Sequence, residues 1–287
     1  MLVDLVFITR NRLAYTKWAL ASVLSDSSEE FSLTIWDNGS SDGTAEYLRN
    51  EVSDPRISNI IFSKENIGQT EAVNQVWERS KADLLGKLDN DCLVTPGWTR
   101  TLSQAHNDID RLGVVACWHF FPDDFDYQRA KHKIQTFGKH KIFRHPWTCG
   151  TGLLIKRETF RKIGPMRGKT TSQYWLKMAT AGYINGFHYP LIYQEHMDDP
   201  KSRYCLIRDK ESFETAAAVT VGLQAGRYKD LRGRLQWRQE IIRNLMDDPY
   251  DPRYYVGWRR KFRSIRNRIH DFIMPLSTTK GLDSTND

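Results

Sequence analysis

Residues 83–91 read Asp-Leu-Leu-Gly-Lys-Leu-Asp-Asn-Asp, the clearest passage in the chain from an apolar run to a polar turn. The run predicts a buried strand from Asp83 to Leu88. Two carboxylates, Asp89 and Asp91, follow it one residue apart. Paired carboxylates at a strand end suit a hard divalent cation, Mg²⁺ or Mn²⁺, that also binds phosphate oxygens. The stretch therefore predicts a strand that ends at a metal and phosphate site.

Strands and helices alternate on both sides of this stretch. Apolar runs predict strands at residues 2–8, 31–36, 57–62, 113–118, 151–156 and 183–189. Helical spacing predicts helices at 13–24, 41–50, 69–80, 96–110, 157–163 and 172–181. Residues 119–146 show no clear periodicity and are expected to form a long loop. The alternation indicates an α/β fold with a largely parallel sheet, whose ligands bind beyond the carboxyl ends of the strands.

The composition is that of an ordinary soluble protein, with a mean hydropathy of -0.58 over 287 residues. No run of eighteen apolar residues occurs, so we expect no transmembrane helix. The N-terminal run contains Asp4 and has no basic lead-in, so we expect no signal peptide. Four cysteines lack any C-x-x-C spacing, which argues against a zinc knuckle and indicates a cytoplasmic protein.

Positive charge is concentrated in two segments. Residues 127–169 hold twelve Lys or Arg against one acid, a net charge of +11, and residues 227–268 hold thirteen against five, a net charge of +8. Such segments suit a polyanionic partner such as nucleic acid, anionic lipid or a phosphorylated acceptor, or they form solvated faces. Residues 258–272 predict a basic amphipathic helix, which suits a membrane surface or packs on the catalytic domain.

Four blocks in order carry a specific resemblance. They are Val6 to Arg12, Ile35 to Thr44, Glu65 to Gly68 followed by Asn74, and Leu88 to Asp91 followed by Pro96-Gly97-Trp98. In these blocks the chain resembles glycosyltransferase family 2 over roughly residues 1–196. The resemblance implies a GT-A fold, a Rossmann-like and mostly parallel sheet flanked by helices, and a transferase that uses a nucleotide-sugar donor. It also implies residues 1–200 as the GT-A domain, with the donor bound by 1–118 and the acceptor by 119–200. Beyond residue 200 the pattern turns mostly helical and predicts a helical basic extension at 201–287.

The resemblance also assigns site residues. Thr9 and Arg12 would line the nucleotide pocket, and Asp37 would accept the imide N–H of uracil, which favours a uridine or thymidine donor and above all a UDP-sugar. Asp91 would be the principal metal ligand, with Asp89 at the ribose or the metal and His196 completing the shell of Mn²⁺ or Mg²⁺. The same pattern assigns donor contacts to Asn38, Asn66, Gly68, Asn90, Gly150 and Gly152. Asp198 and Asp199 would orient His196 or contact the ligand.

The sequence departs from the family at the general base. Inverting members carry an acidic pair at the positions of Thr170 and Thr171, and a threonine cannot deprotonate an acceptor hydroxyl. Either another acid, among Asp123, Asp124 and Glu195, acts as the base, or the reaction is retaining and the donor phosphate takes the proton. A third alternative is a weak catalyst.

Three functions follow from these observations. The first is a metal-dependent glycosyltransferase acting on a polysaccharide, lipid-linked or small-molecule acceptor. The second, suggested by the two basic segments and their interleaved aromatic residues, is a transferase that glycosylates hydroxymethylated bases in DNA. The third is a binding protein for nucleotide sugars or nucleic acid that has lost turnover.

Overall fold

The computed structural model describes residues 1–168, 171–217 and 231–259. The chain divides into two compact units, Met1–Tyr250 and Asp251–Asp287. In the second unit the described residues contain one turn of 3-10 helix, η3 (Pro252–Tyr255), which Asp251 caps. Thr170, residues 227–230 of the second basic segment and all but two residues of the predicted amphipathic helix lie outside the described residues. The predicted domain boundary after residue 200 stays a prediction.

The strands and helices of the first unit follow the predicted order. Its strands are β1 (Val3–Thr9), β2 (Ser32–Asp37), β3 (Ile57–Phe62), β4 (Leu84–Asp89), β5 (Cys92–Val94), β6 (Leu112–Ala116), β7 (Ile134–Phe137), β8 (His140–Arg144), β9 (Leu153–Lys156), β10 (Ile184–Tyr189) and β11 (Gln194–His196). Its α-helices are α1 (Leu13–Leu24), α2 (Thr44–Asn50), α3 (Gln69–Arg79), α4 (Trp98–Asp108), α5 (Tyr127–Ala130), α6 (Arg157–Ile163), α7 (Ser172–Thr180), α8 (Lys210–Ala217) and α10 (Leu231–Asp247). Two 3-10 turns, η1 (Pro122–Asp124) and η2 (Lys131–Lys133), flank α5.

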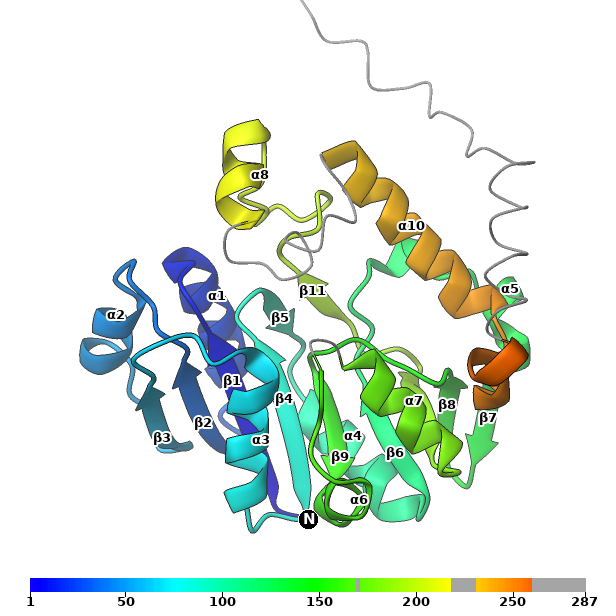
Figure 1. The fold of residues 1–287 in the computed structure, drawn as a ribbon. Coiled ribbons are helices and arrows are strands. Elements are labelled where there is room, and N and C mark those ends of the chain that lie inside the picture. Colours follow the sequence, from blue (N-terminus) through cyan, green and yellow to red (C-terminus); the bar gives the residue numbers. More distant parts are fainter. Residues whose placement is uncertain (169–170, 218–230, 260–287) are drawn as a thin grey trace, which may run out of the picture. The chain divides into compact units, whose positions relative to one another are not determined.

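Within the described residues, nine of these strands form one sheet in the order β3-β2-β1-β4-β9-β6-β10-β8-β7 (Figure 1). Strands β1 to β4 are mutually parallel, and β10 pairs parallel with β6. Only β9 and β8 run against the other strands of this sheet, because each pairs antiparallel with both neighbours. The predicted α/β fold with a mostly parallel sheet is confirmed.

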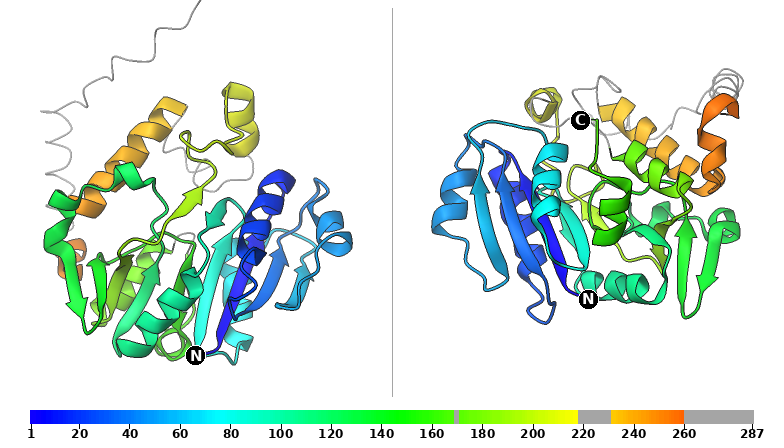
Figure 2. Two further views of the ribbon diagram at one scale, coloured as in Figure 1. Left: turned by 180° about the vertical axis from the view of Figure 1, so that it is seen from behind. Right: turned by 60° about the horizontal axis from the view of Figure 1, so that its bottom comes forward.

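Alternate residues of the strands face two separate cores. Val6 and Ile8 face a core with α3, α6, α7 and α10, whereas Leu5 and Phe7 face a core with α1 and α4. Each face of the sheet is therefore covered by helices, as Figures 1 and 2 show. All these strand residues are at most 7% exposed, which explains the nearly continuous apolar runs in the sequence.

The prediction of a long loop at residues 119–146 was wrong. Residues 134–144 form a hairpin of β7 and β8, with Gly138 in a left-handed conformation at its turn. Part of the strand pattern is present, since His140 and Ile142 are buried and Lys141 between them is exposed. The basic residues of the hairpin concealed it, because they lower the apolar content on which strand prediction depends.

A small second sheet was not predicted either. Strand β11 pairs antiparallel with β5, which follows the Asp89-Asn90-Asp91 turn, and His196 is the register partner of Cys92. This pairing brings the C-terminal part of the domain to the end of β4. No helix in the described part of the chain combines the length and the apolarity needed to cross a membrane.

Candidate active site

Three adjacent strands end in polar residues at one edge of the large sheet. Thr9, the last residue of β1, is the register partner of Asp37, the last residue of β2. On the other side of β1, Ile8 pairs with Asp89, the last residue of β4. Because these strands are parallel, their carboxyl ends meet at the upper edge of the sheet in Figure 1. This is the edge at which α/β folds bind ligands.

Asn90 supports the turn after β1. Its Nδ2 donates to Thr9 Oγ1 at 3.0 Å, to the main-chain oxygen of Asn11 at 3.1 Å and to Thr16 Oγ1 at 3.1 Å. Thr9 and Asn90 are both buried. These bonds hold Asn11 and Arg12 in left-handed conformations, with φ of 53° and 64°. Direct contact of Thr9 or Asn90 with a nucleotide stays a prediction.

Asp37 is held rigidly at the end of β2. Its Oδ1 accepts hydrogen bonds from the main-chain N–H of Ser40 at 3.2 Å and from the Ser40 hydroxyl. Only 2% of the residue is exposed. Burial raises the pKa of Asp37, and the two bonds from Ser40 oppose that rise. The predicted base-binding carboxylate is thus fixed by the turn that follows it.

The Asn38 side chain bonds to the turn before α3. Its Nδ2 donates to Asn66 Oδ1 at 2.8 Å, and the same oxygen accepts the N–H of Gly68 at 3.0 Å. The Oδ1 of Asn38 accepts the N–H of Ile67 at 3.0 Å. A carboxylate at position 38 has no N–H to give Asn66. Asn38, Asn66 and Gly68 therefore join the end of β2 to the turn before α3.

Arg12 connects two carboxylates at this edge. Its Nη1 lies 3.2 Å from Asp91 Oδ2, and its Nη2 donates to Asp198 Oδ1. The guanidinium also lies 4.1 Å from the centre of the Tyr15 ring. Since Asp198 is fully buried, Arg12 is held close to the predicted metal ligand by a strong charge-assisted bond.

Asp91, Cys92 and His196 are, among the described residues, the cluster whose donor atoms fit a metal ion. Those atoms lie within 4.8 Å of one another, and His196 Nε2 lies 3.8 Å from Asp91 Oδ2. The Cys92 thiol is a soft donor, whereas Mg²⁺ and Mn²⁺ favour oxygen ligands. The remaining donors, a carboxylate oxygen and an imidazole nitrogen, fit Mn²⁺ with water completing its shell.

Asp91 is ionised at neutral pH. Burial raises the pKa of its carboxyl, but His196 and Arg12 outweigh burial and lower this pKa to about 2. The carboxylate is therefore available to a cation.

Asp89 has different partners from Asp91. Its Oδ1 accepts a hydrogen bond of 2.5 Å from Lys87 Nζ, which also donates to the main-chain oxygen of Gly150 at 2.7 Å. Burial raises the pKa of Asp89, and Lys87 opposes this rise. Asp89 lies outside the cluster of Asp91, Cys92 and His196, so its part in metal binding stays a prediction.

Gly152 allows β11 to approach β9. Its φ is 59°, and a Cβ atom there would lie 1.8 Å from Gln194 Oε1. Gln194 Nε2 donates to the main-chain oxygen of Thr151 at 3.1 Å. We expected the glycines of this turn to admit the donor sugar, whereas the space beside Gly152 is occupied by Gln194.

Two of the candidate bases form ion pairs. Asp124 accepts from Lys201 at 2.9 Å and from Arg238. Burial raises the pKa of Asp124, but these two cations outweigh it and lower this pKa. Asp123 is exposed and lies 2.9 Å from Lys201. The lowered pKa weakens the Asp124 carboxylate as a proton acceptor.

Glu195 is the third candidate base. It lies on β11 between Gln194 and His196, so its side chain projects from the opposite face of that strand. It accepts a hydrogen bond of 2.6 Å from the Ser202 hydroxyl. Glu195, His196 and Tyr193 line a cavity of about 280 Å³. Within the described residues, no ion pair involves Glu195.

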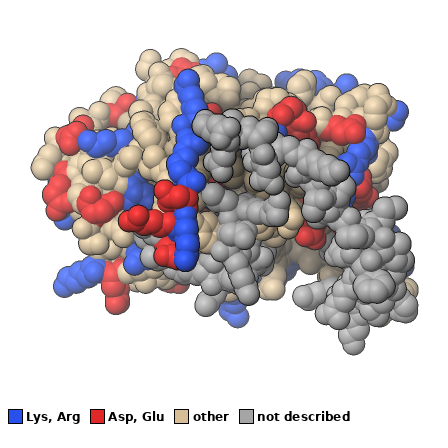
Figure 3. Space-filling view, turned by 90° about the horizontal axis from the view of Figure 1, so that it is seen from above, with Lys and Arg blue, Asp and Glu red and all other residues tan. Residues whose placement is uncertain are grey.

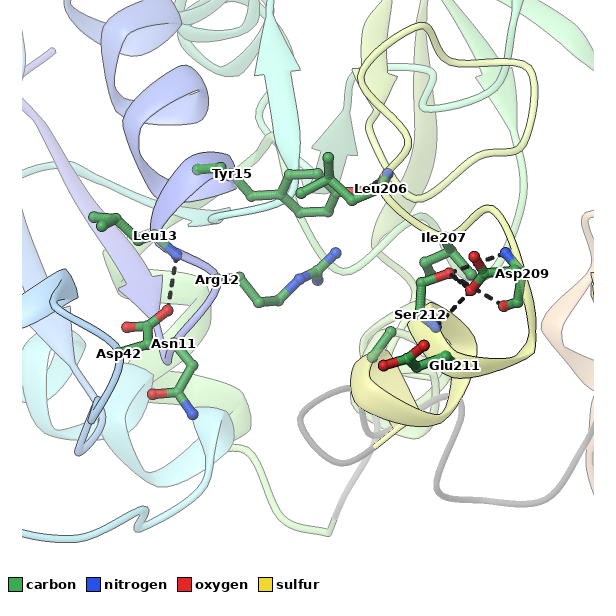
Figure 4. Close-up of a pocket in the computed structure, with 12 residues that line it drawn as sticks. Asn11, Arg12, Leu13, Tyr15, Asp42, Leu206, Ile207, Asp209, Glu211 and Ser212 are labelled. Carbon is green, nitrogen blue, oxygen red and sulfur yellow. Dashed lines mark hydrogen bonds between the residues drawn. The ribbon is translucent and has the colours of Figure 1, made fainter.

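A larger cavity of about 620 Å³ lies between the turn after β1 and residues 206–216. Figure 4 shows the Arg12 side chain extending from that turn toward this segment. Asp42, Asp209 and Glu211 add acidic groups to the lining. The cavity therefore joins the predicted nucleotide edge to the C-terminal part of the unit.

Many cations of residues 127–169 bind within the fold. Contacts of this kind join Arg129 to Asp247 at 3.0 Å, Lys133 to the main-chain oxygen of Leu245, Lys139 to Asp108 at 2.9 Å, Lys156 to the main-chain oxygen of Asp110 at 3.1 Å and Arg157 to that of Ala82 at 2.6 Å. Acidic and basic side chains are also interspersed on the face seen in Figure 3. This segment does not support a DNA or membrane partner.

Lys87, Cys92 and Arg234 were missed by the sequence analysis. Lys87 carried a signal, since a charged residue inside a buried strand requires a partner. Arg234 and Arg238 stand four residues apart on α10, which places them on one helix face. The position of Cys92 beside His196 could not be predicted from the sequence, because it arises from the pairing of β5 with β11.

A sequence model of glycosyl transferase family 2 matches residues 4–164. Among solved structures, the fold is similar to that of the mannosyltransferase PcManGT from Pyrobaculum calidifontis in complex with GDP-Man and Mn²⁺. The two chains are 17% identical with a TM-score of 0.57, and the match covers 97% of this chain and 88% of that chain. No curated protein matches the sequence significantly. At this identity, the likeness to the solved structure shows the fold alone.

Proposed function

Because the chain belongs to glycosyl transferase family 2 and is a glycosyltransferase of the GT-A fold, we propose that it transfers a sugar from a nucleoside diphosphate with a divalent cation held by Asp91 and His196. The observation that supports this metal dependence is the 3.8 Å separation of these two side chains at the strand edge that carries Asp37. A bound cation neutralises the charge that develops on the diphosphate leaving group. Arg12 adds a fixed positive charge beside it.

The proposed donor is a UDP-sugar or a dTDP-sugar. Asp37 presents a carboxylate whose bonds to Ser40 both go to Oδ1. A carboxylate accepts the single imide N–H of uracil or thymine. The structure of the similar mannosyltransferase contains GDP-Man. The test therefore compares uridine and thymidine donors with a guanosine donor.

The test is release of nucleoside diphosphate from UDP-, dTDP- and GDP-sugars. With Mn²⁺ we expect release from a uridine or thymidine donor, and we expect EDTA to abolish it and added Mn²⁺ to restore it. Release that persists in EDTA would contradict the metal dependence. Release from GDP-sugars alone would contradict the base assignment and leave the metal site standing.

The proposed acceptor is a hydroxyl of a glycan or of a lipid-linked or small molecule, in keeping with the family resemblance. Candidate acceptors are incubated with the donor, and the mass of each acceptor is then measured. A DNA duplex that contains 5-hydroxymethylcytosine is tested separately. A sugar-sized mass gain on that duplex would overturn the acceptor proposal.

We also propose Glu195 as the base that deprotonates the acceptor hydroxyl. Glu195 lines a cavity that His196 also lines, and among the described residues no ion pair holds its carboxylate, which accepts from the Ser202 hydroxyl. Asp124, by contrast, is paired with two cations. The proposal implies an inverting reaction.

Replacing Glu195 with Gln tests this role. General-base catalysis contributes about 100- to 10,000-fold, so we expect a loss of kcat in that range with unchanged binding of nucleoside diphosphate. Asp123→Asn is the matched control, since it also removes one carboxylate from this region, and we expect near-normal kcat. Equal rates in the Glu195→Gln variant and the wild type would contradict the role of Glu195 and favour a retaining reaction. The anomeric configuration of the product distinguishes retention from inversion.

A further inference from the structure

Two arginines share one buried carboxylate beside the predicted metal site. Arg12, in the turn after β1, donates to Asp198 Oδ1, and Arg234 Nη2 of α10 lies 3.8 Å from Asp198 Oδ2. Asp198 is 0% exposed. Since Arg12 also contacts Asp91, the four side chains form a continuous row from the metal site to α10.

Arg234 is buried without full compensation. It is 7% exposed, and within the described residues its Nη1 has no hydrogen-bond partner. Its neighbour on the same helix face, Arg238, is bound by both Asp124 and Asp199. A buried guanidinium N–H without an acceptor is costly, so this nitrogen is suited to an anion that binds there.

The charges of the row match a metal and a diphosphate together. Asp91 and Asp198 balance Arg12 and Arg234, so the four groups are neutral when no cation is bound. A divalent cation on Asp91 adds two positive charges. The diphosphate of a sugar nucleotide carries two negative charges, which restores neutrality in a buried site where excess charge is costly.

We propose that Arg12 and Arg234 clamp the donor diphosphate, with Asp198 as the counter-ion that holds both guanidinium groups in position before the donor binds. Two forked guanidinium groups suit phosphate oxygens better than two ammonium groups. This inference rests on the proposed function. It adds to the donor site a helix, α10, that lies beyond the family match at residues 4–164.

The experiment compares Arg234→Met with Arg243→Met by calorimetric titration of UDP and GDP in saturating Mn²⁺. Arg243 lies on the same helix and is only partly buried, so its variant is matched for charge and side-chain change. We expect Arg234→Met to weaken nucleotide binding about 10- to 100-fold, the value of one charge-assisted bond. Arg243→Met should bind like the wild type, and Mn²⁺ alone, measured by electron paramagnetic resonance, should bind all three proteins equally.

Arg234→Lys keeps the charge opposite Asp198 and guards against a folding defect in the Met variant. We expect its nucleotide affinity to fall between those of the Met variant and the wild type, because lysine loses the forked geometry. Wild-type nucleotide affinity in both the Lys and the Met variants would overturn the clamp. Failure of the wild-type protein to bind either nucleotide would instead contradict the proposed function.

Discussion

Replacing Asp91 with Asn abolishes metal-dependent sugar transfer and leaves the fold intact. The variant keeps the size of the side chain but loses the charge that binds the cation. It also leaves Arg12 without its second carboxylate, which adds a positive charge where the cation must bind. The cation supplies several kcal/mol of charge stabilisation, so the rate should fall about a thousandfold or more.

The measurement is nucleoside diphosphate release at saturating donor, together with Mn²⁺ affinity by electron paramagnetic resonance. Asp110→Asn is the control, because Asp110 is an exposed aspartate and its replacement removes the same charge from the surface. We expect that control to keep wild-type rates and affinity. Normal turnover by the Asp91→Asn variant would disprove the assignment of the metal site.

Replacing Gly152 with Ala destabilises the domain by about 2–5 kcal/mol and removes most of the activity. Two costs add. A left-handed φ of 59° is unfavourable for alanine, and the new methyl group would lie 1.8 Å from Gln194 Oε1. Relief of that clash moves the buried side chain of Gln194, on the strand that carries His196, and breaks its hydrogen bond to the main-chain oxygen of Thr151. The free energy of unfolding is measured by denaturant titration, and activity by nucleotide release.

Gly138→Ala separates the two costs. Gly138 has nearly the same φ, 58°, but a Cβ atom there meets nothing within 4 Å. We expect this variant to lose about 1 kcal/mol, the backbone cost alone. Equal destabilisation by the two variants would show that the contact with Gln194 is unimportant. Adding Gln194→Ala to Gly152→Ala should recover part of the stability but not the activity.

The order of strands and helices was predictable because periodicity and apolar content are local properties. Helices at 13–24 and 157–163 and the strand at 57–62 agree with the structure to the residue, and most other strands differ by one or two residues at an end. The hairpin of β7 and β8 was missed because its alternation runs through lysine and histidine. The family assignment rested on four short blocks and is confirmed by the match over residues 4–164.

The candidate site was predictable only in part. The parallel sheet required Thr9, Asp37 and Asp89 to meet at one edge, since each residue ends a strand. No pattern in the sequence pairs Asn38 with Asn66, because that pair depends on the directions in which side chains leave turns. Lys87 and Asp89 stand two residues apart on β4, so strand periodicity places them on one face, and the predicted strand already implied this pair.

The sequence by itself determined the fold class, the polar strand edge at which we propose that the donor binds, and the acidic turn that ends β4. Buried residues recur with a fixed spacing along each helix and strand, so the sequence shows where these elements lie. The carboxyl ends of parallel strands lie at one edge of the sheet, so the sequence also shows which polar residues meet there. The family resemblance assigned His196 to the shell of a metal held by Asp91, and the structure places the two side chains 3.8 Å apart. Only the tertiary structure decided that Arg12 and Arg234 share Asp198. These contacts join segments far apart in the chain. They depend on the pairing of β11 with β5 and the packing of α10, neither of which leaves a local signal.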